Sequence, residues 1–252
     1  MRKKVIKSLI NIGSYQEQFN QIISLSQNKQ SSYVCIANVH MVIESYLDKS
    51  FQDIVNSADM VTPDGMPLAK AIKLLYKIPQ ERVAGMDLLP DLIDFCGQNN
   101  KKIFLYGSTN DILEKIESKA KNSYPNIDIL SYSPPFRRLL QEEEDAIIKS
   151  INLFNPDFVF VALGCPKQEK WMAANKDKIN SCMVGLGGAF EVYAQAKSRA
   201  PKWMQDYSLE WLYRLMQDPK RLWKRYLITN TLYIYLLIIE LIKIKVFRQN
   251  AK

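Results

Sequence analysis

Histidine is almost absent from this chain of 252 residues, which contains only His40. One histidine excludes the paired histidines of an HExxH zinc site. No two aspartates stand two positions apart, so the DxD pair that holds a divalent cation in many transferases is absent as well. The sequence therefore predicts no metal site and no cofactor. His40 itself is compatible with two roles, a structural hydrogen-bond partner or a group that contacts substrate.

Cysteine is sparse, and several common site motifs are missing. The four cysteines show no CxxC spacing, and Cys35 and Cys182 lie inside apolar runs, so we expect reduced thiols in a cytoplasmic protein. Neither a P-loop nor a GxSxG motif occurs, which excludes the sites built on them. The basic residues 1–7 are not followed by the apolar segment of a signal peptide, so no secretion signal is expected.

Short apolar runs rich in β-branched and aromatic residues alternate with helical patterns along the chain. Strands are expected at residues 33–37, 102–106, 128–132, 158–163 and 182–185. Helices are expected between them at 67–75, 87–99, 111–123, 142–152 and 167–180. This alternation predicts an α/β fold, a mostly parallel sheet with helices on both faces, over residues 1–198.

Ligands of such folds bind in the loops that follow the strands. Four of these loops are rich in small or polar residues: 37–40 (ANVH), 106–109 (YGST), 163–169 (LGCPKQE) and 185–191 (GLGGAFE). The last resembles the dinucleotide fingerprint GxGxxG, but Phe190 stands at the third glycine position, which disfavours an NAD-dependent oxidoreductase. It is equally compatible with a plain tight turn or with a backbone cradle for a diphosphate.

A TPDG sequence at residues 62–65 is the other polar feature of this half of the chain. Taken alone it is typical of a type I turn, with Pro63 at the second position and Asp64 bonding the local backbone. In a crevice loop, Asp64 could instead act as a general base that accepts the proton of an attacking hydroxyl.

The last fifth of the chain is basic, aromatic and then apolar, and we expect a helical appendage over residues 199–252. Residues 218–252 carry eight basic and two acidic side chains, which is +6 of the net charge of +8. Arg214, Arg221 and Arg225 would lie along one side of a continuous helix, unless Pro219 breaks it. The apolar segment 227–244 has an uninterrupted core of only eight residues, too short to span a bilayer.

Two interpretations of this appendage stay open beside an ordinary buried terminal helix. Basic residues flank the apolar segment at both ends (Lys224, Arg225, Lys243 and Lys245), which favours docking on an anionic membrane surface. A nucleic-acid-binding module is the alternative that a pI of about 9.1 suggests. No nucleic-acid fold signature accompanies it, so we expect no nucleic acid partner.

Taken together, the motifs resemble the WecG/TagA/CpsF family of glycosyltransferases from about residue 33 to residue 226. The blocks that carry the resemblance are ANVHM (37–41), NSADMVTPDGMPL (56–68), ERVAGMDLL (81–89), FLYGST (104–109), PPF (134–136), NPDFVFVALGCPKQEKWM (155–172), GLGGAFE (185–191), RAPKWMQ (199–205) and LEWLYRLMQDPKRLWKRY (209–226). Each block is weak alone, whereas their number and order are specific.

The resemblance implies roles for individual residues. Asp64 corresponds to the family's catalytic base, and Asn38 to a polar residue near the sugar. The resemblance likewise points to Arg82, Gln168, Arg214, Arg221 and Arg225, and the strand-end loops add His40, Gly107, Gly185, Gly187 and Gly188 to the substrate-binding residues that we expect. Two positions depart from the family pattern, Ile36 where some members carry Thr and Glu191 where Asp is usual.

The resemblance further implies a Rossmann-like fold and an inverting, metal-independent transfer. The donor would be a UDP-sugar, with N-acetylmannosamine the family's best-known cargo and glucose or a uronic acid as alternatives. The acceptor would be a sugar on a polyprenyl diphosphate, used for cell-wall, capsule or exopolysaccharide synthesis. The enzyme would lie in the cytoplasm, peripherally on the inner face of the cell membrane, and a homo-oligomer is compatible with the sequence.

Overall fold

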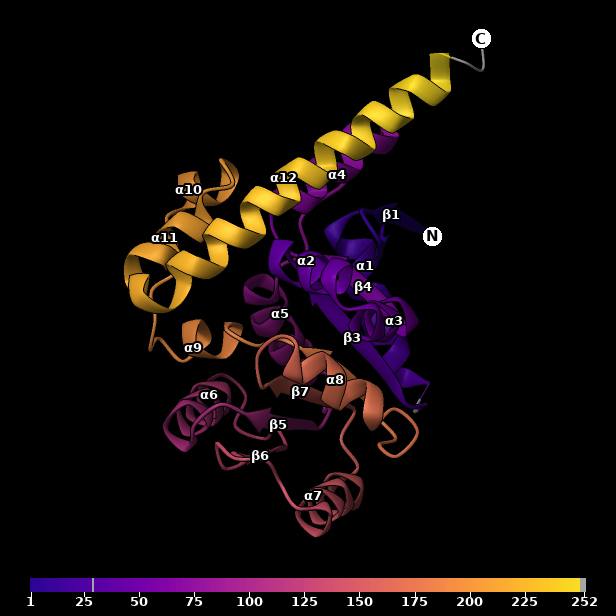
Figure 1. Cartoon of the computed structure of the whole chain (residues 1–252). Helices are drawn as coiled ribbons and strands as arrows, with labels where there is room; N and C mark the ends of the chain where they lie inside the picture. Colours follow the sequence, from indigo (N-terminus) through magenta and orange to yellow (C-terminus); the bar gives the residue numbers. More distant parts are fainter. Residues whose placement is uncertain (29, 250–252) are drawn as a thin grey trace.

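A six-stranded, wholly parallel sheet forms the centre of the molecule (Figure 1). The computed structural model describes the backbone of residues 1–28 and 30–249, and the side chains of these residues up to Ile244. The strands are β3 (Ser32–Ala37), β4 (Met60–Pro63), β5 (Ile103–Gly107), β6 (Ile129–Tyr132), β7 (Phe158–Ala162) and β8 (Cys182–Gly185), in the order β4-β3-β8-β7-β5-β6. The predicted α/β class and parallel sheet are confirmed.

Side chains of successive strand residues enter two different cores, one on each face of the sheet. In β7, Val159 and Val161 lie in one core, whereas Phe158 and Phe160 lie in the other. The first core is covered by α2 (Val39–Leu47), α3 (Lys49–Ser57), α4 (Met66–Tyr76), α7 (Gln141–Phe154) and α8 (Lys167–Ala174). The second is covered by α1 (Tyr15–Gln27), α5 (Gly85–Gln98), α6 (Asn110–Ser123) and α9 (Ala189–Tyr193). Burial on both faces explains why these strands are continuously apolar.

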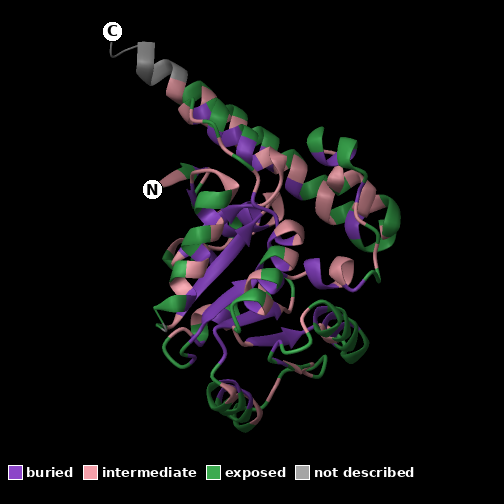
Figure 2. Ribbon diagram, turned by 180° about the vertical axis from the view of Figure 1, so that it is seen from behind, coloured by how far each residue is buried: buried purple, intermediate pink, exposed green. Residues whose placement is uncertain are grey.

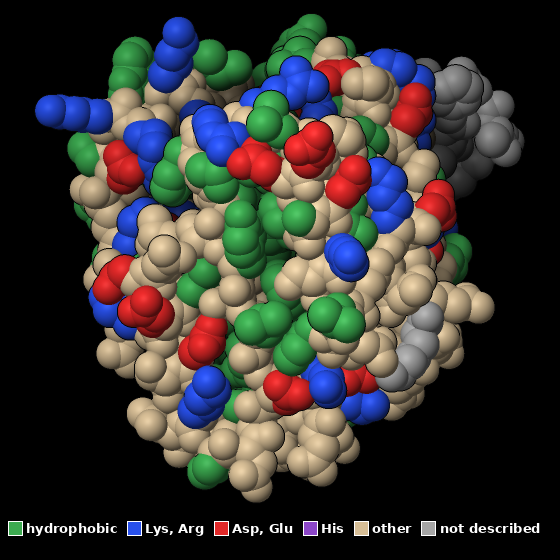
Figure 3. Space-filling view, turned by 90° about the horizontal axis from the view of Figure 1, so that it is seen from below, with side chains coloured by type: hydrophobic (Ala, Val, Ile, Leu, Met, Phe, Trp, Pro, Cys, Tyr) green, Lys and Arg blue, Asp and Glu red, His purple; other side chains and the backbone are tan. Residues whose placement is uncertain are grey.

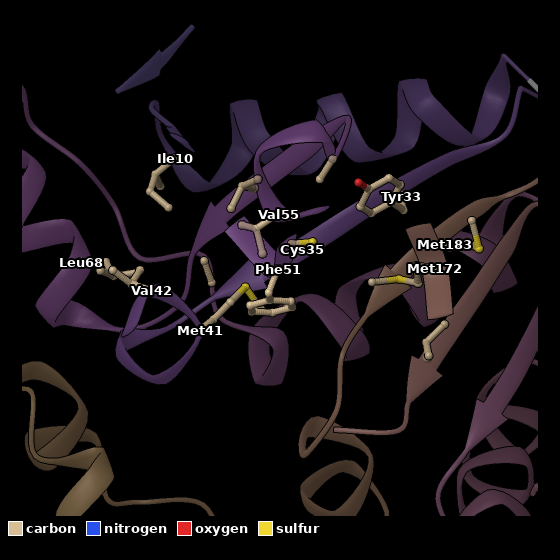
Figure 4. Close-up of a cluster of buried hydrophobic side chains, with 14 of the residues drawn as sticks. Ile10, Tyr33, Cys35, Met41, Val42, Phe51, Val55, Leu68, Met172 and Met183 are labelled. Atoms are coloured by element: carbon tan, nitrogen blue, oxygen red, sulfur yellow. The ribbon is translucent and has the colours of Figure 1, made fainter. Parts of the chain in front are cut away.

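The first core is densest where α2 and α3 pack on β3. Met41 of α2 and Phe51 and Val55 of α3 gather near Cys35, and all four are at most 1% exposed (Figure 4). This packing holds α2 rigidly, and α2 begins directly after the first crevice loop. Figure 2 shows the same arrangement as a largely buried sheet inside helices that are buried on one side and exposed on the other.

Strand β4 and helices α1, α2 and α3 were not expected, and α8 ends at Ala174 rather than at residue 180. The TPDG sequence is not a type I turn, because Thr62 and Pro63 extend β4 and pair with β3. Pro63 is tolerated there because β4 is an edge strand. Gly65 follows with a φ of 90°, which turns the chain into α4.

An antiparallel hairpin, β1 (Arg2–Val5) and β2 (Ser8–Asn11), precedes the α/β unit and joins it to the C-terminal helix. Asn11 Oδ1 accepts a hydrogen bond of 2.9 Å from the Val61 amide of β4. At the hairpin turn, the Ile6 amide donates to Glu240 Oε2 at 2.8 Å. The N-terminal hairpin is therefore attached both to β4 and to α12.

The C-terminal segment consists of α10 (Lys202–Asp206), α11 (Glu210–Gln217) and α12 (Pro219–Gln249). Pro219 does break the helix, because α11 ends at Gln217 and Pro219 begins α12, so Arg214 lies on one helix and Arg221 and Arg225 lie on the next. Helix α12 runs diagonally past α2 and α4, and its Tyr233 hydroxyl donates to the Pro67 carbonyl at 3.2 Å (Figure 1).

Helix α12 is one helix whose segment Pro219–Ile244 is long and apolar enough to cross a membrane by length and composition. From the sequence, the uninterrupted apolar core of only eight residues predicted a segment too short to span a bilayer, and the structure shows a longer helix. In the fold, Leu222 and Tyr233 are buried, and Leu236, Leu237 and Leu241 pack on the first core. The other side of the helix exposes apolar side chains: Leu227, Ile228, Ile234, Tyr235, Ile238 and Ile242. Lys245, which was expected to flank the segment, has its side chain outside the described part.

The face seen from below in Figure 3 carries apolar side chains near its centre with acidic and basic ones around them. Strand β6 is the edge of the sheet opposite β4, and Leu130 and Tyr132 of β6 are exposed. The expected homo-oligomer stays a prediction.

Candidate active site

The site lies at the ends of two neighbouring strands whose following helices pack on opposite faces of the sheet. Strands β3 and β8 are adjacent, but α2 follows β3 into the first core and α9 follows β8 into the second. The loops after the two strands therefore diverge and open a crevice at their carboxyl ends, which is the usual ligand site of such sheets.

A pocket of about 940 Å³ occupies this crevice. Its floor is formed by the loops after β3, β4, β7 and β8, and helices α10, α11 and α12 cover it from the other side. The volume falls within the range of pockets that hold cofactor-sized ligands. Of the twelve expected site residues, eleven line it: Asn38, His40, Asp64, Arg82, Gln168, Gly185, Gly187, Gly188, Arg214, Arg221 and Arg225.

Gly107 is the expected site residue that does not line this pocket. It has a φ of 107°, and a Cβ built on it would lie 2.5 Å from the Ala162 carbonyl oxygen. The structure thus gives Gly107 a packing role between β5 and β7, where a larger residue does not fit. Its expected substrate contact stays a prediction.

Asp64 is placed by the end of the edge strand. Its amide continues the parallel ladder by donating to the Ala37 carbonyl at 2.7 Å, and its side chain enters the pocket. Burial raises the pKa of Asp64 to about 6, although Arg214 and Arg82 favour the charged form, and Glu210 opposes them. A carboxyl group with this pKa is mostly ionised near pH 7, yet basic enough to accept a proton.

Asn38 caps α2 and faces Asp64 at the same time. Its Oδ1 accepts the Met41 amide at 3.1 Å, which satisfies one free N–H of the helix terminus. Its side chain also hydrogen-bonds Asp64 and lowers the pKa of that carboxyl group, against the larger effect of burial. The capping bond leaves the amide end of Asn38 free to orient Asp64.

Gln168 joins two of the crevice loops. Its Oε1 accepts the Gly164 amide at 3.2 Å, and its Nε2 donates to the Gly185 carbonyl at 3.2 Å and to Glu169 Oε1 at 2.7 Å. A Cβ on Gly185 would lie 3.0 Å from Gln168 Nε2, so glycine is what permits this approach. Burial raises the pKa of Glu169 to about 7, against the hydrogen bond from Gln168. Gln168 therefore shapes the glycine loop from beneath.

His40 is neutral at physiological pH in this site. Burial lowers its pKa to about 4, with the positive charge of Arg225 acting in the same direction and the Cys165 carbonyl opposing both. Among the described side chains, His40 Nδ1 and Arg225 Nε are buried without a hydrogen-bond partner. The buried Nε–H of Arg225 carries a desolvation cost that a bound acceptor removes, whereas Nδ1 of the neutral His40 ring is itself an acceptor, since the ring N–H donates to the Cys165 carbonyl.

Arg82 belongs to an ionic network that sequence reasoning did not identify. Its guanidinium contacts Glu210 at 3.2 Å, Asp87 at 3.0 Å and Gln205 Oε1 at 3.0 Å. Glu210 also lies 3.5 Å from Arg214. The spacing of Glu210 and Arg214, four residues apart on an expected helix, was a signal for this pair. Gln205 has no such signal, because only the tertiary fold brings it to Arg82.

The arrangement can move a proton and hold an anion. Asp64 supplies a carboxylate of raised pKa, while the glycine loop and the arginines of α11 and α12 surround it. Guanidinium groups match phosphate oxygens in charge and geometry. In the described part of the chain, no group of three or more His, Cys, Asp or Glu side chains gathers as a metal site.

Comparison with known proteins agrees with this geometry. The pattern of the glycosyl transferase WecG/TagA/CpsF family matches residues 3–246. An N-acetylglucosaminyldiphosphoundecaprenol N-acetyl-beta-D-mannosaminyltransferase of Bacillus subtilis (strain 168) is 34% identical over 200 residues, which cover 79% of this chain and 76% of the relative. A protein of the same name from Staphylococcus aureus (strain MW2) is 31% identical over 198 residues, or 78% and 76% of the two chains.

Proposed function

Since this chain belongs to the WecG/TagA/CpsF family and is a glycosyltransferase, we propose that it transfers N-acetylmannosamine from its UDP-linked form to a sugar carried by a polyprenyl diphosphate. The names of the relatives support this donor and acceptor, and cell-wall biosynthesis would use the product. UDP-glucose or a UDP-uronic acid is the alternative donor. The observation that carries the proposal is the carboxyl group of Asp64 inside a pocket lined by glycines and arginines.

In the proposed reaction Asp64 is the general base. Its carboxylate accepts the proton of the acceptor hydroxyl, whose oxygen forms a bond to the anomeric carbon as the bond to the UDP oxygen breaks. The anomeric configuration inverts in this single displacement. A pKa of about 6 leaves roughly ten ionised carboxylates for each protonated one at pH 7, so the base form dominates.

UDP leaves with the electron pair of the broken bond, and its charge needs compensation. We assign this role to the backbone of residues 185–188 and to the guanidinium groups of Arg214, Arg221 and Arg225. Arg225 offers a buried Nε–H without a partner among the described side chains. Fixed donors of this kind stabilise developing charge without reorganising. In this mechanism no metal ion is required, so a chelator should leave the rate unchanged.

The acceptor is attached to a lipid, and helix α12 offers the surface that such a substrate needs. Leu227, Ile234, Tyr235, Ile238 and Ile242 are each at least 50% exposed along it. Trp203 of α10 and Trp223 of α12 are also more than half exposed. An apolar helix face beside exposed aromatic rings is typical of a segment lying in the membrane interface. We propose that residues 199–252 dock the enzyme peripherally on the inner face of the cell membrane.

The test offers the enzyme a panel of UDP-sugars together with a short-chain polyprenyl-diphosphate N-acetylglucosamine acceptor. Release of UDP measures the turnover. Turnover should be greatest with UDP-N-acetylmannosamine. Asp64→Asn should lower kcat by about 10²–10⁴-fold, because a neutral amide cannot accept the proton. A folded Asp64→Asn enzyme with near-normal turnover would exclude Asp64 as the base. Turnover with none of the UDP-sugars would refute the proposed donor class.

A further inference from the structure

We infer that Glu210 is a positioning residue, which holds the appendage helix α11 over Asp64 and directs Arg214 into the pocket. The inference rests on the proposed function, because it assigns Arg214 to the leaving diphosphate. Glu210 carries a negative charge into a pocket that is to bind an anion, so its presence requires an explanation.

The two oxygens of Glu210 contact arginines from different parts of the fold. Oε2 lies 3.2 Å from Nη1 of Arg82, in the loop before α5, and Oε1 lies 3.5 Å from Nη2 of Arg214, one turn along α11. The side chains of Glu210 and Arg82 are only 19% and 12% exposed. A carboxylate that bridges two guanidinium groups removes their mutual repulsion, which would otherwise push α11 away.

Arg82 is the fixed end of this bridge. Besides Glu210, its Nη2 donates to Asp87 at the start of α5 and to Gln205 of α10, both at 3.0 Å. Three of the five N–H groups of Arg82 are therefore used by the protein itself. Gln205 is held in turn, because its Nε2 donates to the Ala200 carbonyl at 2.8 Å. Arg82 thus acts mainly as a support of the network.

Arg214 is the free end. Its contacts with described side chains, Glu210 and the sulfur of Met86 at 3.6 Å, are both made by Nη2. Its Nε and Nη1 hydrogens therefore stay available for an anion. Among the charged groups around Asp64, Arg214 has the largest effect on the pKa of that carboxyl group, and it lowers this pKa. Glu210 thus orients the arginine whose charge acts most strongly on Asp64.

Helix α11 depends on this network because it lacks a buried anchor. None of its eight residues is fully buried. Apolar burial therefore does not hold α11 as it holds the helices of the two cores. An ion-paired attachment of this kind leaves the helix able to open when the bridge is lost.

The test compares Glu210→Gln with Glu117→Gln in the full-length enzyme. Glu117 is a matched control, since it pairs with Lys121 four residues along α6, is 24% exposed and lies outside the pocket. Glu210→Gln should lower kcat about tenfold and change the KM of the donor much less, because Arg214 acts on charge that develops in the transition state. Glu117→Gln should match the wild type.

A double-mutant cycle tests whether Glu210 acts through Arg214. If it does, Glu210→Gln adds little to the loss caused by Arg214→Gln, whereas independent effects would multiply. Multiplying effects, or a folded Glu210→Gln enzyme with wild-type kcat, would overturn the inference. Should Glu210→Gln not fold, Glu210→Asp replaces it, because the shorter side chain keeps the charge but cannot reach both arginines.

Measurements without transfer separate this inference from the proposed function. UDP binding can be followed by the fluorescence of Trp211 and Trp223, which line the pocket. Trypsin can probe the opening of residues 199–218. Glu210→Gln should weaken UDP binding and speed cleavage of this segment, each about tenfold, even if the wild type turns over none of the UDP-sugars. Unchanged UDP binding and unchanged cleavage would refute Glu210 as the positioning residue.

Discussion

Replacing Asp64 by Asn should stabilise the protein above pH 6 while removing its catalytic base. Burial raises the pKa of Asp64 from 3.8 to about 6, so the folded protein holds this charge at a cost. Asparagine has the same shape and no charge, and therefore avoids that cost. A gain in stability together with a loss of turnover is expected when the replaced side chain destabilises the fold but is required for catalysis.

The size and pH range of the gain follow from linkage. Below pH 3.8 the carboxyl group is protonated in both the folded and the unfolded chain, so the two proteins should be equally stable. Between pH 3.8 and about 6 the wild type loses stability as pH rises, because only the unfolded chain ionises freely. Above that range the difference is constant. A shift of about two units corresponds to about 3 kcal/mol as an upper value.

Thermal unfolding at pH 4 to 8 measures this difference. An upper value of about 3 kcal/mol predicts a Tm of Asp64→Asn higher by up to about 10 °C at pH 7, and by almost nothing at pH 4. Glu143→Gln is a control for which the opposite change in Tm is expected. Arg137 holds the pKa of Glu143 at about 2, so the charge of Glu143 stabilises the fold and its removal should lower the Tm at pH 7. A Tm of Asp64→Asn at or below that of the wild type at pH 7 would refute the reasoning.

Three further substitutions test other parts of the structure. Changing both Ile234 and Ile238 to Asn should weaken binding to anionic vesicles about tenfold or more, because it removes apolar surface without adding positive charge, while Leu153→Asn on the exposed side of α7 should not; equal binding of all three proteins in a flotation assay would count against the docking surface. Gly107→Ala should lower the free energy of urea unfolding by roughly 1–3 kcal/mol, because its Cβ meets the Ala162 carbonyl at a positive φ; an unchanged midpoint would show that the two strands can separate. Gln168→Ala leaves the Gly164 amide without its partner and removes one hydrogen bond of Glu169, and should cost about 1–3 kcal/mol; the same unfolding curve as wild type would show that the clamp contributes nothing.

Elements with a strong periodic pattern could be predicted from the sequence, and weakly patterned ones could not. Strand β8 was predicted at its observed bounds and β7 within one residue, because uninterrupted apolar runs of this length indicate buried parallel strands. Helix α1 was missed although Ser14 and Glu17 form a capping box, since its surface is largely polar. Strand β4 was missed because Pro63 and Asp64 also fit a turn.

The candidate site divides in the same way. Local sequence was enough to nominate Asp64, the glycine loop after β8 and the arginines of the appendage, because each is a short motif beside a strand end or a helix. It was not enough to show that Arg82 is held by Glu210 and Gln205, more than 120 residues away along the chain. Pairings over that distance leave no periodic signal in a single sequence.

Sequence by itself determined the α/β class, the strand-end position of the crevice and the chemical types of residue available there, since these depend on local periodicity and side-chain chemistry. Tertiary structure alone decided which charges meet. Burial raises the pKa of Asp64, and the fold brings Glu210 to Arg82 from the far end of the chain. Both effects come from the packing of segments far apart in the chain, and desolvation and Coulomb energies depend on that packing.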